Sequence, residues 1–339
     1  MDRVNICLVG AGRAAEVHGD VYYFSIPGAI ITAVFDADAE KAKILAEKYH
    51  INERFVFKKF EDALSYAVFD AVVITTPTFT HCQYTKLAAS KKVHVFCEKP
   101  MAITEKDCSE MIDICIKENV ILQIGFMRRF DAGFRQAKQI MESGEIGEPL
   151  IIKSNTRGPG LPGRWAFDIK NSNGNLAEVN SHDFDSIRWL SGSEYKKIYA
   201  VAKNSKSSEI REEYPLFYDN ATVSATMKND VFGLIDGVCP CDYGYDARCE
   251  VVGTMGVLFI GSIQEYTTVT CTRKKQLVSP QVLSWKKRFH DAYIAEDRHF
   301  VECIINGKEP EVTGEDGKRS VAAVVAANES IFKGVPVEL

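Results

Sequence analysis

The sequence lacks the features that mark membrane, nucleic-acid-binding and secreted proteins. No apolar run approaches the roughly 20 residues that are needed to cross a bilayer. Charge of one sign is not in excess, because 41 Lys and Arg residues face 46 Asp and Glu residues and give a formal net charge of −5. No basic segment precedes the first apolar run, residues 4–9, so no signal peptide is expected. These absences predict a globular, cytoplasmic protein with no nucleic-acid or membrane partner.

Cysteine pairs with the spacing of metal or redox motifs are also absent. The chain has ten cysteines but no C-x-x-C pair, and its tightest cluster is Cys239-Pro240-Cys241, with Cys249 eight residues further on. No histidine lies near this cluster at the spacing of a zinc ligand, so we expect no metal site. The thiols are expected to be free, as is usual in a reducing compartment.

The pattern of apolar runs divides the chain in two, as a length of 339 residues at about 150 per domain suggests. In residues 1–125 the apolar runs 4–9, 30–35, 71–75, 93–97 and 120–125 alternate with helical stretches. Uninterrupted apolar strands between helices are typical of a parallel sheet that is covered on both faces. This pattern predicts an α/β, doubly wound first domain.

The rhythm changes in residues 126–339. Helices are predicted at residues 131–143, 176–190, 290–305 and 314–332, and a series of strands without long helices between them at residues 195–283. Strands that follow one another before the last helices are typical of an α+β domain with a mostly antiparallel sheet. We therefore predict a second domain over residues 126–339.

The strongest local signal is the segment 10–15, whose sequence G-A-G-R-A-A fits the pattern G-x-G-x-x-(G/A). A strand precedes it and a helix follows it, as a dinucleotide-binding turn requires. Gly10 allows a tight turn, Gly12 leaves room for a pyrophosphate, and the helix N-terminus attracts its charge. We predict cofactor contacts from Gly10, Gly12, Arg13 and Ala14. The alternative is a purely structural turn.

Asp36 ends the second predicted strand. A carboxylate at this position accepts hydrogen bonds from a ribose diol and repels a 2′-phosphate, which predicts NAD as the cofactor in preference to NADP. No arginine follows before Arg54, in agreement with that choice. Alternatively, Asp36 and Asp38 serve only to cap the next helix, a role that suits Asp38.

Two further segments lie at the carboxyl ends of predicted strands, the edge where open α/β sheets bind ligands. In the first, Thr75, Thr76 and Pro77 are expected to contact the cofactor, and His81 either reaches its phosphates or lies on the surface. In the second, Glu98 and Lys99 precede Pro100 and are also expected to contact the cofactor. A lysine at this edge can stabilise the alkoxide that develops during hydride loss, although most lysines are merely solvated.

A fourth set comprises Glu178, His182, Asp185 and Trp189, whose steps of four, three and four place them on one face of the predicted helix 176–190. Ionisable groups on a largely apolar helix are costly unless they are paired or functional. A histidine between carboxylates is well suited to act as a base near neutral pH. A buried structural network remains the alternative.

Four motifs together resemble the Gfo/Idh/MocA oxidoreductases in order and spacing, and the resemblance covers essentially the whole chain. They are G-A-G-R at residues 10–13, E-K-P at 98–100, G-F-M-R-R-F at 125–130, and Glu178-x-x-x-His182-x-x-Asp185. The segment F-H-D-A-Y-I-A-E at 289–296 resembles the inositol dehydrogenase branch. The resemblance implies a Rossmann domain, an α+β domain with a large open sheet for substrate binding and oligomerisation, and a homodimer or homotetramer.

The resemblance also implies bound NAD and oxidation of a secondary hydroxyl on a sugar or cyclitol. The catalytic lysine and histidine of the family correspond to Lys99 and His182, whereas Glu178 stands where the family usually has aspartate. Pocket residues of related enzymes correspond to Arg128, Arg129, Arg157 and Tyr293. Trp165 lies in a Gly/Pro-rich loop, 157–168, which either covers the substrate or is an inert surface loop.

The mechanism that we expect on this basis assigns the hydroxyl proton to His182 and the alkoxide to Lys99, with the hydride passing to C4 of the nicotinamide. Glu178 and Asp185 are expected to orient His182 or to hold neighbouring hydroxyls. Two alternatives remain: an NAD-dependent glycoside hydrolase that works by transient oxidation and elimination, and a non-catalytic NAD-binding regulator.

Overall fold

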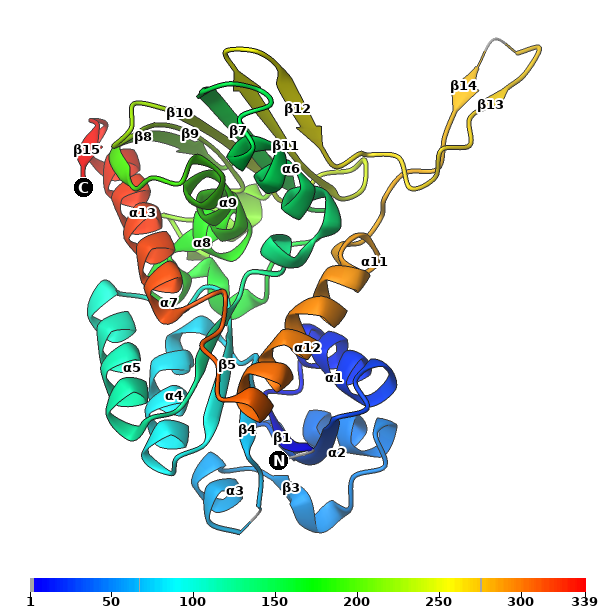
Figure 1. Ribbon diagram of the computed structural model, residues 1–339, viewed down its shortest axis with the longest axis vertical. Helices are drawn as coiled ribbons and strands as arrows, with labels where there is room; N and C mark the ends of the chain where they lie inside the picture. Colours follow the sequence, from blue (N-terminus) through cyan, green and yellow to red (C-terminus); the bar gives the residue numbers. More distant parts are fainter. Residues whose placement is uncertain (1–2, 67, 275) are drawn as a thin grey trace. The chain divides into compact units, whose positions relative to one another are not determined.

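The computed structural model describes residues 3–66, 68–274 and 276–339, which pack as two compact units (Figure 1). The first unit takes the chain as far as Phe130 and includes Asp291–Val321, and the second unit takes Asp131–His290 and Ala322–Leu339. A C-terminal segment therefore packs with the first unit, which the predicted division at residue 125 did not foresee. The boundary between two folding domains at residues 125 and 126 stays a prediction.

The first unit contains a parallel six-stranded sheet with strand order β3-β2-β1-β4-β5-β6. The strands are β1 (Val4–Val9), β2 (Ala29–Phe35), β3 (Val56–Phe57), β4 (Ala71–Ile74), β5 (His94–Glu98) and β6 (Leu122–Gly125). Every residue of β4 is buried, because helices cover both faces of a parallel sheet. The doubly wound α/β fold is thus confirmed.

The helices of this unit are α1 (Arg13–Ser25), α2 (Ala39–Lys48), α3 (Phe60–Tyr66), α4 (His81–Ser90), α5 (Glu105–Glu118) and α12 (His290–Asn306). The strand order reverses between β1 and β4, which both pair at the middle of the sheet. At such a reversal the loops that leave neighbouring strands diverge and open a crevice at the carboxyl edge. The segments after β1, β4 and β5 meet at this edge.

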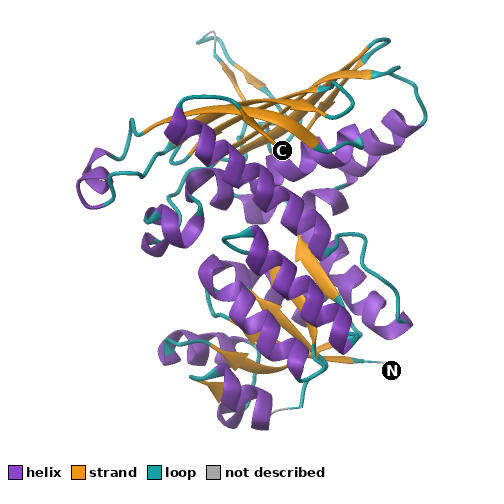
Figure 2. Cartoon of the chain, turned by 90° about the vertical axis from the view of Figure 1, so that its left-hand side faces the viewer, coloured by secondary structure: helices purple, strands orange, loops and turns teal. Residues whose placement is uncertain are grey.

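The second unit contains a seven-stranded sheet with order β12-β11-β7-β10-β9-β8-β15, mostly antiparallel, in which β7 and β10 pair in parallel. Its strands are β7 (Pro149–Arg157), β8 (Tyr195–Lys203), β9 (Asn220–Met227), β10 (Phe232–Val238), β11 (Asp246–Gly253), β12 (Val257–Ile260) and β15 (Val337–Glu338). The predicted α+β fold is confirmed. Figure 2 shows this broad sheet with helices against one face.

Alternation along these strands gives the sheet two different faces. Toward α9 (Ser181–Ser191), a Cβ at Gly233 of β10 would lie 3.1 Å from Ile187, so the strand and the helix pack closely. The opposite face exposes large apolar side chains, namely Tyr199, Val201, Phe232, Leu234 and Phe259.

Further helices are α6 (Ala132–Glu142), α7 (Ile169–Ser172), α8 (Gly174–Glu178), α10 (Ser208–Glu213), α11 (Trp285–Arg288) and α13 (Gly314–Lys333). Strand β13 (Thr270–Cys271) pairs with β14 (Leu277–Val278) in a separate hairpin.

The prediction of one continuous helix over residues 176–190 is wrong. Helix α8 ends at Glu178 and α9 begins at Ser181, with Asn180 as its N-cap. The Asn180 side chain donates to Asp183 Oδ2 (2.8 Å) and to the carbonyl oxygen of Asp236 (3.4 Å). Such bonds offer the chain an alternative to helix continuation. Glu178 therefore lies on a different helix from His182, and the single stripe that the spacing predicted does not exist.

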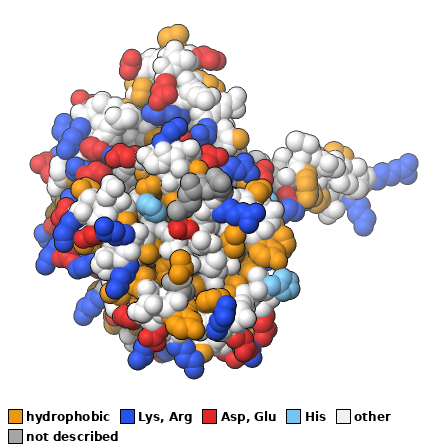
Figure 3. Space-filling view, turned by 60° about the horizontal axis from the view of Figure 1, so that its bottom comes forward, with side chains coloured by type: hydrophobic (Ala, Val, Ile, Leu, Met, Phe, Trp, Pro, Cys, Tyr) orange, Lys and Arg blue, Asp and Glu red, His pale blue; other side chains and the backbone are white. Residues whose placement is uncertain are grey.

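Charged groups are mixed on the surface. On the face that Figure 3 shows, basic and acidic side chains lie among one another, as the small net charge predicts. No helix within the described residues is long and apolar enough to span a bilayer.

Candidate functional site

The loop after β1 has the geometry of a phosphate-binding turn. Gly10 has φ +102°, and a Cβ there would lie 2.9 Å from Thr75 Oγ1, so glycine is required both by the backbone and by the neighbouring loop. Gly12 is the N-cap of α1 and supplies no side chain to that helix end, and a Cβ there would meet nothing within 4 Å. The first amides of α1, which lack acceptors within the helix, are thus not covered by a side chain at position 12.

Asp36 and Asp38 have separate roles. Asp36 Oδ2 accepts a hydrogen bond from the Ala11 amide (2.7 Å) and Oδ1 accepts one from the Asp38 amide (2.8 Å). Asp38 is the residue that caps α2, through the amides of Glu40 and Lys41. The alternative in which Asp36 only caps this helix therefore does not hold, because its carboxylate is tied to the glycine-rich loop.

The loop after β4 is joined to the E-K-P turn by His81. This imidazole is buried, with Nδ1 2.9 Å from the Pro100 carbonyl and Nε2 2.7 Å from the Thr76 carbonyl. Burial lowers the pKa of His81, against the opposing effect of these carbonyls. Both ring nitrogens thus face backbone oxygens, and the expected reach of His81 toward a phosphate gives way to a role in holding two loops together.

Glu98 is the last residue of β5 and its carboxylate points inward. Oε2 accepts a hydrogen bond from the Lys99 amide (3.0 Å), and Oε1 lies 3.0 Å from His18 Nε2. Opposite it in β6, a Cβ at Gly125 would lie 3.0 Å from Oε1, so glycine keeps space for the carboxylate. The Glu98 carboxylate thus contacts His18 and the Lys99 amide, and its contact with the cofactor stays a prediction.

His18 was missed by the sequence analysis. It lies on α1, fully buried, with Nδ1 2.8 Å from Asp297 Oδ1 on α12. The pair is 279 residues apart in sequence, so no local pattern connects them. Spacing alone offered a weak signal, because His18 falls on the buried face of α1 between Ala15 and Tyr22.

The two adjacent arginines that resemble pocket residues are buried in the first unit. They lie in the 3₁₀ turn Met127–Phe130. Arg129 forms an ion pair with Asp316 Oδ1 (3.0 Å), and the other oxygen of that carboxylate accepts a hydrogen bond from the Thr313 amide (2.8 Å). Arg129 thus ties this turn to the start of α13, which favours a structural role, whereas Arg128 stays a predicted pocket residue.

In the second unit, His182 lies in the first turn of α9 and is buried. The neighbouring Asp183, fully buried, accepts hydrogen bonds from Ser154 Oγ (2.6 Å), Thr156 Oγ1 (2.7 Å) and Asn180 Nδ2 (2.8 Å). These bonds fasten the start of α9 to β7. Asp183 lies outside the predicted stripe of His182 and Asp185, so helical spacing contains no signal for it.

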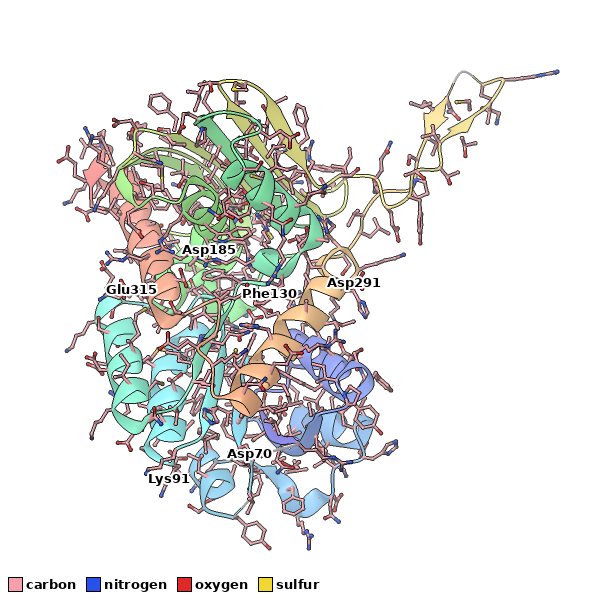
Figure 4. The ribbon with its side chains drawn as sticks, in the orientation of Figure 1. Asp70, Lys91, Phe130, Asp185, Asp291 and Glu315 are labelled. Carbon is pink, nitrogen blue, oxygen red and sulfur yellow. The ribbon has the colours of Figure 1, made fainter. Side chains whose placement is uncertain are left out.

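Asp185, labelled in Figure 4, lies three residues after His182 on α9 and is 1% exposed. With Asp183 it raises the pKa of Tyr195, although burial of that phenol is the larger cause. Trp189 follows one turn later and is half-buried, as is Glu178 at the end of α8. Asp183 and Asp185 are therefore both close to His182 along α9. Of these two, Asp183 forms the network that anchors the helix, a role that the spacing does not predict.

Arg157 is not on the same side of the sheet as α9. Ser154 and Thr156 of β7 point toward α9, whereas Arg157 bonds Asp236 Oδ1 (2.6 Å) and the Tyr243 hydroxyl (3.0 Å) on the other face. A cavity of about 610 Å³ opens there, lined in part by these three residues. The structure therefore does not bring Arg157 together with His182.

The remaining predicted pocket residues fall in different units. Tyr293 is buried on α12 of the first unit, where its ring meets His18 edge-on at 5.4 Å. Trp165 lies in the turn Arg164–Phe167 of the second unit, half-buried, and a Cβ at Gly163 would lie 2.7 Å from its Nε1. Glycine at position 163 thus allows the indole to fold back on its own loop.

Comparison with known families matches both units. Residues 4–126 match the model of an oxidoreductase family, NAD-binding Rossmann fold, and residues 138–339 match the model of an oxidoreductase family, C-terminal alpha/beta domain. The N-terminal match spans the glycine-rich loop, Asp36 and the E-K-P turn.

Individual relatives span the full length of the chain. The scyllo-inositol 2-dehydrogenase (NAD(+)) of Bacillus subtilis is 33% identical to this chain, and the alignment spans 99% of this chain and 96% of that protein. The myo-inositol 2-dehydrogenase of Thermotoga maritima is 31% identical, with 99% and 98% covered. Among solved structures, scyllo-inositol dehydrogenase from Lactobacillus casei with bound NAD(H) and scyllo-inositol superimposes with a TM-score of 0.89 at 25% identity and 99% coverage of both chains.

Proposed function

Because this chain belongs to the Gfo/Idh/MocA oxidoreductase family, we propose that it is a dehydrogenase that oxidises a secondary hydroxyl of an inositol-type polyol to a ketone, or catalyses the reverse reaction. Its cofactor is NAD, held by the Rossmann unit. The observation that carries the proposal is the full-length similarity to inositol dehydrogenases, one of them solved with both NAD(H) and scyllo-inositol. The bound nicotinamide supplies the hydride acceptor.

The residues proposed to hold the dinucleotide surround the glycine-rich loop. The amides of Arg13 and Ala14 begin α1 and face the open space at Gly12, where they can donate to a diphosphate. Thr75, Thr76 and Pro77 leave the neighbouring strand at the same edge. His81 supports this loop through its two carbonyl contacts.

Asp36 is proposed to select NAD over NADP. Its carboxylate is held by the Ala11 and Asp38 amides at the end of β2, where a ribose diol can donate to it and a 2′-phosphate would meet its negative charge. We expect kcat/KM to be at least about 100-fold higher with NAD⁺ than with NADP⁺. Asp36→Ser should reduce that ratio about tenfold or more, measured by initial rates with each cofactor. A preference of the unaltered protein for NADP⁺ would refute this assignment.

Lys99 and His182 are proposed to act on the substrate hydroxyl. His182 accepts its proton as general base, and the Lys99 amine holds the oxygen and stabilises its developing charge. Support comes from how each is held: Glu98 binds the Lys99 amide, and Asp183 anchors the start of the helix that carries His182. Asp185 is proposed to orient the imidazole, and Glu178 to hold a second substrate hydroxyl.

A homodimer or homotetramer is also part of the proposal. The face of the large sheet opposite α9 exposes Tyr199, Val201, Phe232, Leu234 and Phe259, a set of apolar side chains of the kind that interfaces cover. Light scattering in solution tests this, and a monomer at micromolar concentration would contradict it.

A substrate screen tests the function. We expect NADH to form from NAD⁺ with myo-inositol or scyllo-inositol, with lower kcat/KM for aldoses, and the product to be the corresponding ketone by NMR. Release of an aglycone from glycosides without net NADH would instead indicate the hydrolase. Cofactor binding without turnover on any polyol or glycoside would indicate a regulator.

A further inference from the structure

One histidine and three carboxyl groups share a buried cluster at the base of the E-K-P turn. His18 lies between Asp297 on α12 (2.8 Å from Nδ1) and Glu98 on β5 (3.0 Å from Nε2), and Glu296 lies beside Asp297. His18, Glu296 and Asp297 have no exposed surface, and Glu98 is 7% exposed. Asp291, labelled in Figure 4, lies near the start of α12, the helix that brings both acidic residues.

The two carboxylate contacts favour the doubly protonated form of the ring. A neutral imidazole has one N–H, so it can donate to only one of two carboxylates, whereas the doubly protonated ring donates to both. Burial alone lowers the pKa of His18, but Asp297 and Glu98 outweigh it and raise that pKa well above its ordinary value. Burial, and then the charges of Glu98 and Asp297, raise the pKa of Glu296, which favours its neutral form.

His18 takes part in no step of the proposed reaction, yet it is linked to the turn that carries Lys99. The Glu98 carboxylate uses one oxygen for His18 and the other for the Lys99 amide. Gly125 leaves the space that this carboxylate occupies, 3.0 Å from where a Cβ would be. Among the described residues, no group of three or more possible ligands is arranged to hold a metal ion.

We propose that His18 is a positioning residue for Lys99, acting through the Glu98 carboxylate and anchored by Asp297. This inference rests on the proposed role of Lys99. His18 holds Glu98 in the one orientation that also receives the Lys99 amide, and Asp297 prevents the ring from turning away. The Lys99 backbone is thereby fixed by a chain of bonds that starts on α12, and loss of the His18–Glu98 bond releases the turn.

Two substitutions of His18 separate the two ring contacts. The side-chain amide nitrogen of asparagine takes the place of Nδ1 and that of glutamine the place of Nε2, so His18→Asn keeps the bond to Asp297 and His18→Gln keeps the bond to Glu98. Both remove the same charge from the same buried site. They are therefore matched controls for destabilisation, which thermal unfolding of each variant measures.

We expect His18→Asn to lower kcat about 100-fold, because a small displacement of a reacting group has this effect, and His18→Gln to lower it less than about fivefold. The KM for NAD⁺ should be similar in both variants. In the protein without cofactor, the Lys99 amide should exchange with deuterium about tenfold faster in His18→Asn than in His18→Gln, as the loss of a hydrogen bond predicts. Equal losses of kcat, or equal Lys99 exchange, would overturn the proposal.

Failures of the two proposals are distinguishable. Full turnover by Lys99→Ala would refute the role of Lys99, whereas exchange at the Lys99 amide still tests the His18–Glu98 link. Should His18→Asn fail to fold, Glu98→Asp provides the second variant, because a side chain one carbon shorter cannot reach both His18 and the Lys99 amide. Faster Lys99 exchange in Glu98→Asp supports the link, and unchanged exchange contradicts it.

Discussion

Asp183 in the second unit and Asp297 in the first are both completely buried, and the protein satisfies them in different ways. Asp183 receives three hydrogen bonds from neutral donors, two hydroxyls and an amide. Asp297 faces an imidazole that Glu98 shares. Burial raises the pKa of Asp297 and His18 opposes that effect. Neutral donors stabilise a buried carboxylate without a change of charge between pH 6 and 10, whereas a histidine shared by two carboxylates donates to both, and adds its positive charge, only while the ring is doubly protonated.

The comparison matters for function because each network leads to a different proposed catalytic residue. The Asp183 network fastens the helix that carries His182, and the Asp297 network reaches the backbone of Lys99 through His18 and Glu98. We expect the second to depend on pH over the neutral range, because it contains a histidine, and the first not to, because its hydroxyl and amide donors do not titrate. Variants that remove either catalytic side chain or either aspartate, and a rise in pH that removes the proton on His18, therefore test different parts of this contrast.

The largest effect is expected from the catalytic side chains themselves. His182→Ala and Lys99→Ala should each lower kcat about 10³-fold, because each removes a group that acts on the developing alkoxide. The Kd for NAD⁺, measured by fluorescence titration, should change less than about threefold in both variants. The double variant should lose little beyond the single ones if both act on one hydroxyl, and additive losses would show that they act in separate steps.

Asp183→Ala should be the most destabilising of the aspartate substitutions at neutral pH. It removes the carboxylate that accepts from Ser154, Thr156 and Asn180 in a buried site, which we expect to lower the free energy of unfolding by about 3 kcal/mol. Asp183→Asn should cost about half as much, because one carbonyl oxygen still accepts. Urea denaturation followed by circular dichroism measures both. A loss below about 1 kcal/mol for Asp183→Ala would show that the network does not anchor α9.

Much of the first unit could be predicted from the sequence because its signals are local. Glycine at position 10 satisfies a positive φ, glycine at position 12 leaves the helix end open, and both precede a helix that starts within three residues. The apolar runs that alternate with helices in this unit are typical of one arrangement, a parallel sheet. The glycine-rich turn and the parallel sheet therefore follow from short-range signals that periodicity captures, whereas the order of the strands does not.

What the sequence could not reveal depends on contacts between distant segments. The break before α9 is stabilised by a bond from Asn180 to the carbonyl of Asp236, which lies 56 residues later. Arg157 points away from α9 because side chains alternate between the two faces along β7. An error of one residue in the predicted strand would assign Arg157 to the wrong face. His18 and Asp297 come from opposite ends of the chain. Spacing on a single helix or strand contains none of this information.

The smallest effect separates the two aspartates by pH. The folded-state pKa of His18 is raised, so its contribution to stability is complete below its unfolded-state pKa of about 6.5 and is lost as the pH rises through the folded-state value. Ionisable groups around it are Glu98, Glu296, Asp297, Tyr22 and Tyr293. The raised pKa values of Glu296, Asp297 and Tyr22 act in the same direction as that of His18.

The destabilisation caused by Asp297→Ala should therefore shrink as the pH rises from 6 to 10, by about 1 kcal/mol in total, because the His18 charge that Asp297 stabilises disappears. The destabilisation caused by Asp183→Ala should stay constant over the same range, since its hydroxyl and amide donors do not titrate there. Urea denaturation of both variants and the unaltered protein at each pH gives the two curves. If the destabilisation of both variants varied with pH in the same way, His18 would be neutral in the folded protein. The proposed difference between charged and neutral anchoring of the two aspartates would then be wrong.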